Sequence, residues 1–196
     1  MTAKMPPAAE LENSVVRLEP LTMAHVPDLF AAGGRDDEVW RWLPVPTPQT
    51  EEDLAKVAGY VLKDPGHVAH AVILRSSGRA VGWTTYIDCP GADQSLEIGW
   101  TWYGRAVWRS AVNTSCKLLL IDHAFDTLGF NRVQLKTDIR NERSQNAIRR
   151  IGGVYEGTLR RQRLRPDGTW RDTVYFGILE EEWPPHRTHL QSTLTG

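Results

Sequence analysis

The segment from residue 96 to residue 153 decides the fold. It contains LEIGWTW (96–102), WRSAVNT (108–114), RVQLKTD (132–138) and NERS (141–144), and it ends in the glycine pair 152–153. Apolar and alternating runs predict two strands, and polar cap residues ahead of apolar residues at helical spacing predict a helix after each strand. We expect the first helix to begin at Asn113 and the second to begin at Asn141 and end before Gly152.

A strand that leads through a short loop into a helix is an arrangement that binds phosphate. The first N–H groups of a helix have no partner within it, and the helix dipole places partial positive charge at the same end. Here the loop carries the charges of Arg105 and Arg109 and the hydroxyl groups of Ser110 and Thr114, which add donors for an anion. The alternative is an ordinary helix start with Asn113 as its cap.

The flanking segments predict one mixed α/β sheet. Antiparallel hairpins come first and alternating strands and helices follow, which favours helices on both faces of the sheet. Strands are expected at 15–21, 68–74, 80–87, 95–102, 131–138, 154–160 and 173–179; helices at 22–34, 49–64, 113–128 and 141–151; and turns at 76–79 and 165–168.

Length and composition are typical of a globular protein. The chain has 196 residues, of which 41% are apolar and 24% charged, and this length suits one domain. We expect a disordered lead-in over 1–13, a single domain over 14–184 and a flexible tail over 185–196. A net charge of −1 and the absence of a long apolar run argue against nucleic-acid and membrane partners. The two cysteines and six histidines lack metal-ligand spacing, so we expect no metal, free thiols and a cytoplasmic location.

The order of LEIGWTW, WRSAVNT and NERS ahead of the glycine pair resembles the GNAT superfamily of acyl-CoA-dependent N-acyltransferases, and its RimJ/RimL-like branch most closely. The resemblance implies a mostly antiparallel sheet that splays between the fourth strand (95–102) and the fifth (131–138). It implies transfer of acetyl from acetyl-CoA to a primary amine, either a protein N-terminal α-amine or a small molecule, by direct attack. Relatives are often dimers, so a homodimer is among the expected assemblies.

The same resemblance assigns the coenzyme A contacts. In the family, backbone amides of the loop that opens the helix cradle the pyrophosphate, and in this chain that loop comprises Trp108, Arg109, Ser110, Ala111, Val112, Asn113 and Thr114. Ala111 replaces the family glycine and Asn113 replaces the final small residue, but backbone donors need only room for the phosphates. The pantetheine arm is expected along Trp100 and Trp102, whose alternative role is that of core aromatics.

Three residues are candidates for the chemistry. The resemblance brings Asn141 to the cofactor arm and Ser144 near its sulfur, where the hydroxyl would donate to the departing thiolate; the alternative is a capping pair. An ammonium acceptor must lose a proton before it attacks, and Glu97 is positioned to relay that proton through water. Glu97 could instead face solvent or pair with an arginine, and Glu156 is a weaker candidate.

An arginine cluster precedes the turn at 165–168. Arg160, Arg161, Arg163 and Arg165 could clamp an anionic group of the acceptor, with Arg161 and Arg163 as substrate contacts, or accept a charged acyl donor such as succinyl-CoA. The alternative is a charged hairpin tip. A non-catalytic acyl-CoA-binding regulatory domain is a further reading, and an acyl-enzyme on Cys116, near the start of its helix, is a minor one.

Overall fold

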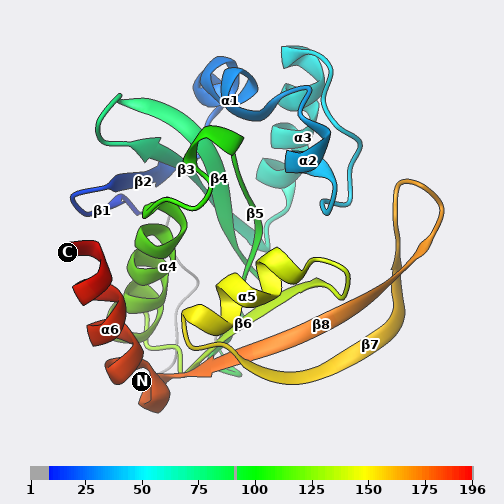
Figure 1. Cartoon of the computed structure of the whole chain (residues 1–196). Coiled ribbons are helices and arrows are strands. Elements are labelled where there is room, and N and C mark those ends of the chain that lie inside the picture. The colour runs from blue at the N-terminus through cyan, green and yellow to red at the C-terminus, as the bar shows by residue number, and fades with distance from the viewer. Residues whose placement is uncertain (1–8, 91, 196) are drawn as a thin grey trace.

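The eight strands of the described chain form one sheet. The computed structural model describes residues 9–90 and 92–195, and the strand order is β1-β2-β3-β4-β5-β6-β8-β7 (Figure 1). Neighbours are antiparallel except for the parallel pair β5 and β6. The strands are β1 (Leu11–Glu12), β2 (Val16–Pro20), β3 (His67–Leu74), β4 (Arg79–Ile87), β5 (Ser95–Tyr103), β6 (Arg132–Asp138), β7 (Val154–Leu164) and β8 (Trp170–Leu179).

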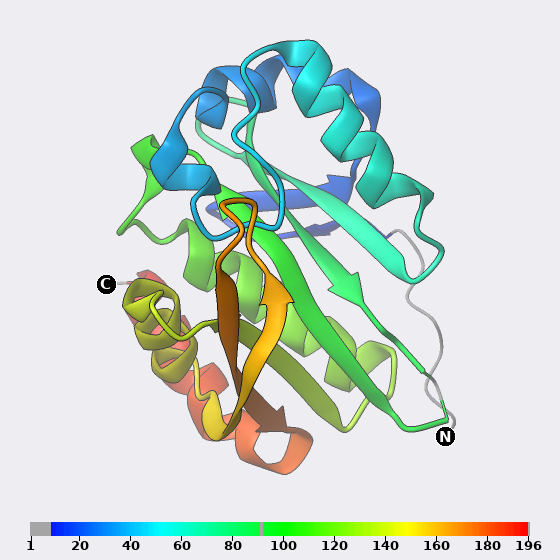
Figure 2. The ribbon, with the colours of Figure 1, turned by 90° about the vertical axis from the view of Figure 1, so that its right-hand side faces the viewer.

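Helices cover both faces of this sheet, as the sequence predicts. The helices are η1 (Met23–His25), α1 (Val26–Gly33), α2 (Asp37–Trp40), α3 (Glu51–Lys63), η2 (Arg105–Val107), α4 (Val112–Asp122), η3 (His123–Thr127), α5 (Glu142–Arg150), η4 (Glu180–Glu182) and α6 (Trp183–Thr195). α1 to α3 pack on one face against β3, β4 and part of β5, whereas α4, α5 and α6 lie on the other face (Figures 1 and 2). No helix in the described ranges is long and apolar enough to cross a membrane.

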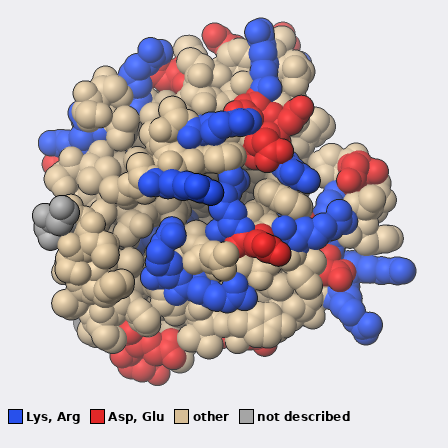
Figure 3. Space-filling view, viewed as in Figure 1, with Lys and Arg blue, Asp and Glu red and all other residues tan. Residues whose placement is uncertain are grey.

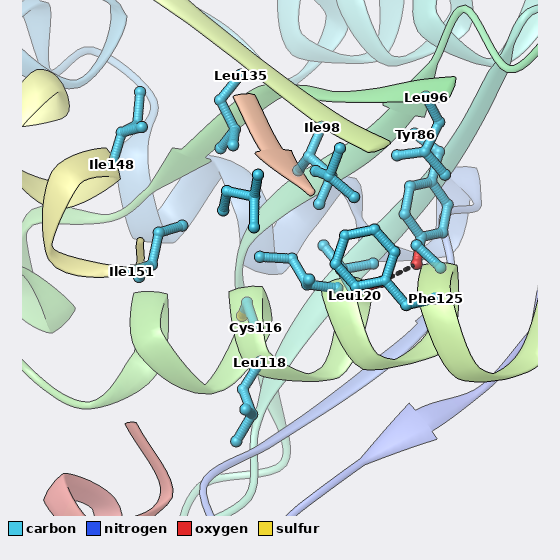
Figure 4. Packing of buried hydrophobic residues seen from close by; sticks show 14 of the residues in the cluster. Tyr86, Leu96, Ile98, Cys116, Leu118, Leu120, Phe125, Leu135, Ile148 and Ile151 are labelled. Carbon is cyan, nitrogen blue, oxygen red and sulfur yellow. Dashed lines mark hydrogen bonds between the residues drawn. The ribbon is translucent and has the colours of Figure 1, made fainter. Parts of the chain in front are cut away.

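The α4 face holds the larger core. Tyr86, Leu96 and Ile98 from the sheet pack against apolar side chains of α4 (Figure 4), and the Tyr86 hydroxyl donates to the carbonyl of Leu120 at 2.7 Å. That bond satisfies a polar group that would otherwise be costly to bury. The packed core therefore fixes the position of α4 against β4 and β5.

A bulge in β5 reverses which residues face which core. Leu96 and Ile98 belong to the α4 core, but beyond Trp100 the alternation shifts, so that Tyr103 faces α4 and Trp102 faces the other core. Trp100 has a φ of 49°, in the left-handed region that few non-glycine residues occupy. The extra residue therefore shifts the side-chain alternation of β5 by one position.

The start of α4 differs from the prediction. The helix begins at Val112 and not at Asn113, because Ala111 already has helical angles and its carbonyl accepts a hydrogen bond from the N–H of Ser115 at 2.9 Å. Asn113 therefore lies inside the first turn and is not the cap. The predicted cap of α5 is confirmed, since Asn141 Oδ1 accepts from the N–H of Ser144 at 3.1 Å.

Where the sequence suggests a flexible tail over 185–196, the described residues form most of α6. Trp183 and Leu190 are buried against the α4 core, so the tail carries apolar anchors that its polar composition hides. Pro184 and Pro185 lie in the first turn of the helix, where a missing N–H costs nothing.

The other end of the chain also departs from the expectation. Of the predicted disordered lead-in over 1–13, residues 1–8 lie outside the described part, and Leu11–Glu12 forms β1 by pairing with β2. The last hairpin is longer than predicted, since β7 continues to Leu164 and β8 begins at Trp170.

Candidate active site

The gap between β5 and β6 is the centre of the site. The two strands pair at only three positions, from Ser95 with Arg132 to Glu97 with Gln134, although β5 continues to Tyr103 and β6 to Asp138. Beyond Glu97 the strands no longer pair with each other, so the predicted splay is confirmed. Backbone N–H and C=O groups along these facing edges can pair with an amide-bearing ligand.

The first turn of α4 offers free donors. Within the described residues, the N–H groups of Asn113 and Thr114 have no hydrogen-bond acceptor. Arg109 just before the helix has a φ of 59°, and a left-handed residue beside helical ones turns successive N–H groups toward one concave surface. The turn therefore has the geometry of an anion site without the glycine that the family uses there.

The side chains of Ser110 and Trp108 stabilise the loop through hydrogen bonds to its own backbone. The Ser110 hydroxyl donates to the carbonyl of Val107 at 2.7 Å, and the N–H of Val112 donates back to Ser110 Oγ at 3.3 Å. The Trp108 indole N–H donates to the carbonyl of Tyr103 at 2.8 Å. Ser110 is thus engaged within the loop, and Thr114 is the hydroxyl that remains for a ligand.

Arginines surround the same turn. The Arg143 guanidinium of α5 lies 3.6 Å from the centre of the Trp108 ring, and Arg105 pairs with Asp36 at 2.6 Å. Burial, reinforced by the charges of Arg105 and Arg109, lowers the pKa of Arg143. Figure 3 shows Lys and Arg side chains gathered near the middle of this face of the molecule. An anion bound here would offset the mutual repulsion of these cations.

The two tryptophans of β5 have different surroundings. Trp102 is buried among Trp40 and Trp83, with ring centroids 5.0 Å away in each case, so its side chain is a core aromatic and only its backbone can meet a ligand. Trp100 is half-buried at the bulge, and its ring lies beside that of Tyr60 at 5.9 Å.

Asn141 and Ser144 lie just past the carboxyl end of β6, at the open end of the splay. Asn141 is largely buried, and its Oδ1 is used by the cap. Neither the Asn141 side-chain amide N–H groups nor the Ser144 hydroxyl has a partner among the described residues. Both groups can therefore donate to a ligand in the gap.

Glu97 is buried and paired. Its Oε2 lies 2.7 Å from Lys136 Nζ and accepts from Gln134 Nε2 at 3.0 Å, and 3% of its side chain is exposed. The partner is a lysine of β6, whereas the sequence suggested an arginine. Glu156, the weaker candidate, makes a two-pronged ion pair with Arg132 that lowers the pKa of its carboxyl.

Sequence reasoning missed Asp138, which ends β6. Arg165 Nε and Nη2 donate to its two carboxylate oxygens at 2.7 Å and 3.0 Å, and both side chains are largely buried. Burial raises the pKa of Asp138, but the hydrogen bonds from Arg165 outweigh it, and the net pKa is lowered. The available signal is an acidic residue at the last position of a strand with alternating side chains. Arg165 is thus tied to the sheet and is not a free clamp.

The other predicted arginines lie along the hairpin. Arg161 has a φ of 49° and donates its backbone N–H to Asp172 Oδ1 at 2.7 Å, and it lines a hollow with Arg160 and Gln162. Arg163 is exposed. A different hollow contains Arg165, so the structure does not bring the predicted cluster to one place.

Cys116 is fully buried in the α4 core, where burial raises the pKa of its thiol to about 12. A thiol that stays protonated and covered by side chains is a poor nucleophile. The acyl-cysteine alternative therefore loses its support.

A free helix N-terminus lies at the mouth of a gap between splayed parallel strands. This arrangement is typical of proteins that bind a phosphate-bearing ligand with an amide-containing arm, such as acyl-CoA. Residues 16–154 match the family described as the acetyltransferase (GNAT) domain. The chain belongs to this family of acyl-CoA-dependent N-acyltransferases, as the resemblance predicted.

Relatives and solved structures agree with this assignment. The chain is 30% identical over 106 residues to the provisionally named ribosomal N-acetyltransferase YdaF of Bacillus subtilis (strain 168), a match that spans 54% of this chain and 57% of that protein. A GCN5-related N-acetyltransferase from Brucella melitensis is 29% identical with a TM-score of 0.92, covering 97% of this chain and 87% of that one. Mycobacterium smegmatis RimJ in complex with CoA-disulfide shares the fold, with 22% identity, a TM-score of 0.76 and coverage of 95% and 93%. The likeness to RimJ concerns the fold alone.

Proposed function

We propose that this N-acyltransferase moves acetyl from acetyl-CoA to a primary amine. The observation that carries the proposal is the splay of β5 from β6 beside the unpaired N–H groups of α4. The pyrophosphate would meet the backbone of residues 108–114, and the pantetheine arm would lie along β5 at Trp100 and Trp102, with Asn141 donating to it. The acceptor amine would be a protein N-terminal α-amine or a small-molecule amine, the two classes that the family resemblance implies.

The proposed reaction is direct attack. The acceptor nitrogen forms a bond to the thioester carbon, the carbon–sulfur bond breaks, and the nitrogen gives up a proton. Backbone N–H groups of β5 beyond Glu97 would stabilise the charge that develops on the carbonyl oxygen. The free Ser144 hydroxyl would donate to the departing thiolate, while Glu97, which lies 2.7 Å from Lys136 Nζ, would accept the amine proton through water.

The first experiment is calorimetric binding of acetyl-CoA to the wild type and to Asn113→Glu, which puts a negative charge in the first turn of α4. Asn131→Glu is the matched control, because Asn131 precedes β6 at the end away from the splay. We expect Asn113→Glu to weaken binding at least about tenfold and the control to bind like the wild type. A wild type that binds no acyl-CoA would remove the proposal.

Turnover then tests the chemistry. The wild type is assayed with acetyl-CoA and succinyl-CoA against a panel of amines, alongside Ser144→Ala and Glu97→Gln. We expect acetyl-CoA to be the better donor and both variants to lower kcat by about 10- to 100-fold while binding of acetyl-CoA is retained. Binding without turnover of any amine would identify a non-catalytic acyl-CoA-binding domain instead.

A further inference from the structure

Three loops line a partly open cavity that includes Arg140, the residue before the cap of α5. The cavity has a volume of about 400 Å³ and is lined by Arg41, Trp42, Arg140, Arg165 and Asp167. These residues come from the loop after α2, the β6–α5 loop and the turn between β7 and β8. Figure 2 shows that turn reaching the loop that follows α2. Segments far apart in sequence thus converge on one pocket.

The cavity lining holds three arginines and one carboxylate, Asp167. Arg165 is neutralised by Asp138, whereas Asp167 keeps its charge in the cavity: hydrogen bonds from Thr169, and to a smaller extent the charges of Arg165 and Arg140, lower its pKa. Arg41 has one exposed partner, Glu38, at 3.2 Å, and exposed pairs of this kind contribute little. Within the described ranges, the Arg140 guanidinium has no ion pair or hydrogen bond. Arg140 is therefore available to an anionic group, and Arg41 is weakly held.

The position of Arg140 links the cavity to the reaction. Arg140 directly precedes Asn141, the cap of α5, and its backbone N–H donates to Asp138 Oδ1 at 2.9 Å. The buried pair of Asp138 with Arg165 thereby fixes the loop that carries Arg140. A ligand bound to Arg140 would have its other end near Asn141 and Ser144.

We propose that the acceptor is a small primary amine that also carries a carboxylate or a phosphate group, and that Arg140 and Arg41 bind this group while the amine faces the thioester. This inference rests on the proposed function. A cavity of about 400 Å³ is at the size typical of small-molecule sites. Guanidinium groups suit carboxylate and phosphate oxygens. The Arg41 guanidinium lies over the Trp42 ring, 5.1 Å from its centre, so Trp42 orients Arg41 in the cavity.

The test compares paired acceptors that differ only in the anionic group. Phosphoethanolamine is compared with ethanolamine, and an α-amino acid with its carboxamide, using acetyl-CoA and the wild type, Arg140→Gln, Arg41→Gln and Arg75→Gln. Arg75 is the control, because it is an exposed arginine paired with one glutamate, Glu12, at the far end of β3. We expect the anionic member of at least one pair to have the higher kcat/KM. Arg140→Gln should raise its KM roughly tenfold with kcat unchanged.

Binding is measured as well, so that this inference can fail separately from the proposed activity. Calorimetry follows phosphoethanolamine and the amino acid binding to wild type and Arg140→Gln in the presence of coenzyme A. Binding that is lost in Arg140→Gln but retained in Arg75→Gln supports the anion site even if no amine is acetylated. Equal binding and equal kcat/KM for neutral and anionic partners would overturn it, as would a preference for a neutral protein N-terminus.

Discussion

Lys117 is a buried cation that has no carboxylate partner among the described residues. Its Nζ lies 3.1 Å from Thr101 Oγ1 and 3.5 Å from Thr84 Oγ1, and these two hydroxyls lie 2.8 Å from each other. Burial lowers the pKa of this lysine from 10.5 to about 8. The two hydroxyls remain hydrogen-bonded to each other without Lys117. Burial of the Lys117 ammonium therefore destabilises the native state.

Replacing Lys117 with Met should therefore stabilise the protein. The native lysine binds fewer protons than the unfolded one between pH 8 and pH 10.5, so the cost is fully present below pH 8 and fades as the pH rises toward 10.5. We expect Lys117→Met to raise the free energy of unfolding by roughly 1–3 kcal/mol at pH 7, and by less at pH 10. Urea unfolding at the two pH values measures this. A less stable variant at pH 7 would mean that the threonine contacts outweigh desolvation.

At the scale of elements, the sequence predicts the helix starts that depend on local side chains. It does not predict the elements whose ends depend on contacts distant in sequence. Thr50 and Asn141 cap α3 and α5 through their own side chains, and both helix starts were predicted because the cap is local. The ends of the last hairpin and the whole of α6 depend on contacts that no neighbouring residue reveals. Arg187, for example, joins α6 to Asp122 and Asp126 at 2.6 Å each.

The packing of α6 gives a direct comparison. Leu190 is 2% exposed, whereas the adjacent His189 is exposed. We expect Leu190→Ala to lower the free energy of unfolding by about 2–3 kcal/mol, and His189→Ala to change it by less than about 0.5 kcal/mol. Thermal and urea unfolding of the two variants would show this. Equal, small effects would indicate that α6 contributes little in solution, as the predicted flexible tail implied.

At the scale of the whole molecule, the order of elements predicted the mixed sheet and the family resemblance predicted its splay, and the structure confirms both. The place of the acyl-CoA site stays a prediction. What could not be predicted is how loops distant in sequence combine. The sequence singled out Arg161 and Arg163, yet the cavity next to Asn141 takes Arg140 and Arg41 from two other loops. No periodicity or spacing in the sequence relates those loops, because they meet only in the folded molecule, where the turn between β7 and β8 lies near the loop after α2.

A histidine buried against the sheet, His70, should also affect how the stability of the whole protein changes at low pH. His70 is fully buried with both ring nitrogens unpaired within the described residues, and burial, with a smaller contribution from the charge of His123, lowers its pKa to about 4. Around it lie the Tyr86 ring and His123, whose own pKa is lowered by burial.

Because the unfolded chain binds the proton that native His70 refuses, stability should fall as the pH drops from 6.5 toward 4. We expect His70→Leu to show a shallower fall, since only His123 and the carboxylates then respond. Unfolding free energies at pH 7, 6 and 5 give the two slopes, which can be compared even if the variant is less stable overall. Parallel slopes would show that His70 is not the group that responds.

The bulge at Trp100 has a consequence for how this strand is compared with others. Before it, even-numbered side chains face α4; after it, odd-numbered ones do. Counting alternate residues from Leu96 without a gap would therefore assign Trp102 to the wrong side of the sheet, and Thr101 and Tyr103 with it. The alternation of side chains therefore shifts by one position within β5, and an alignment with a strand that lacks this bulge needs one inserted position there.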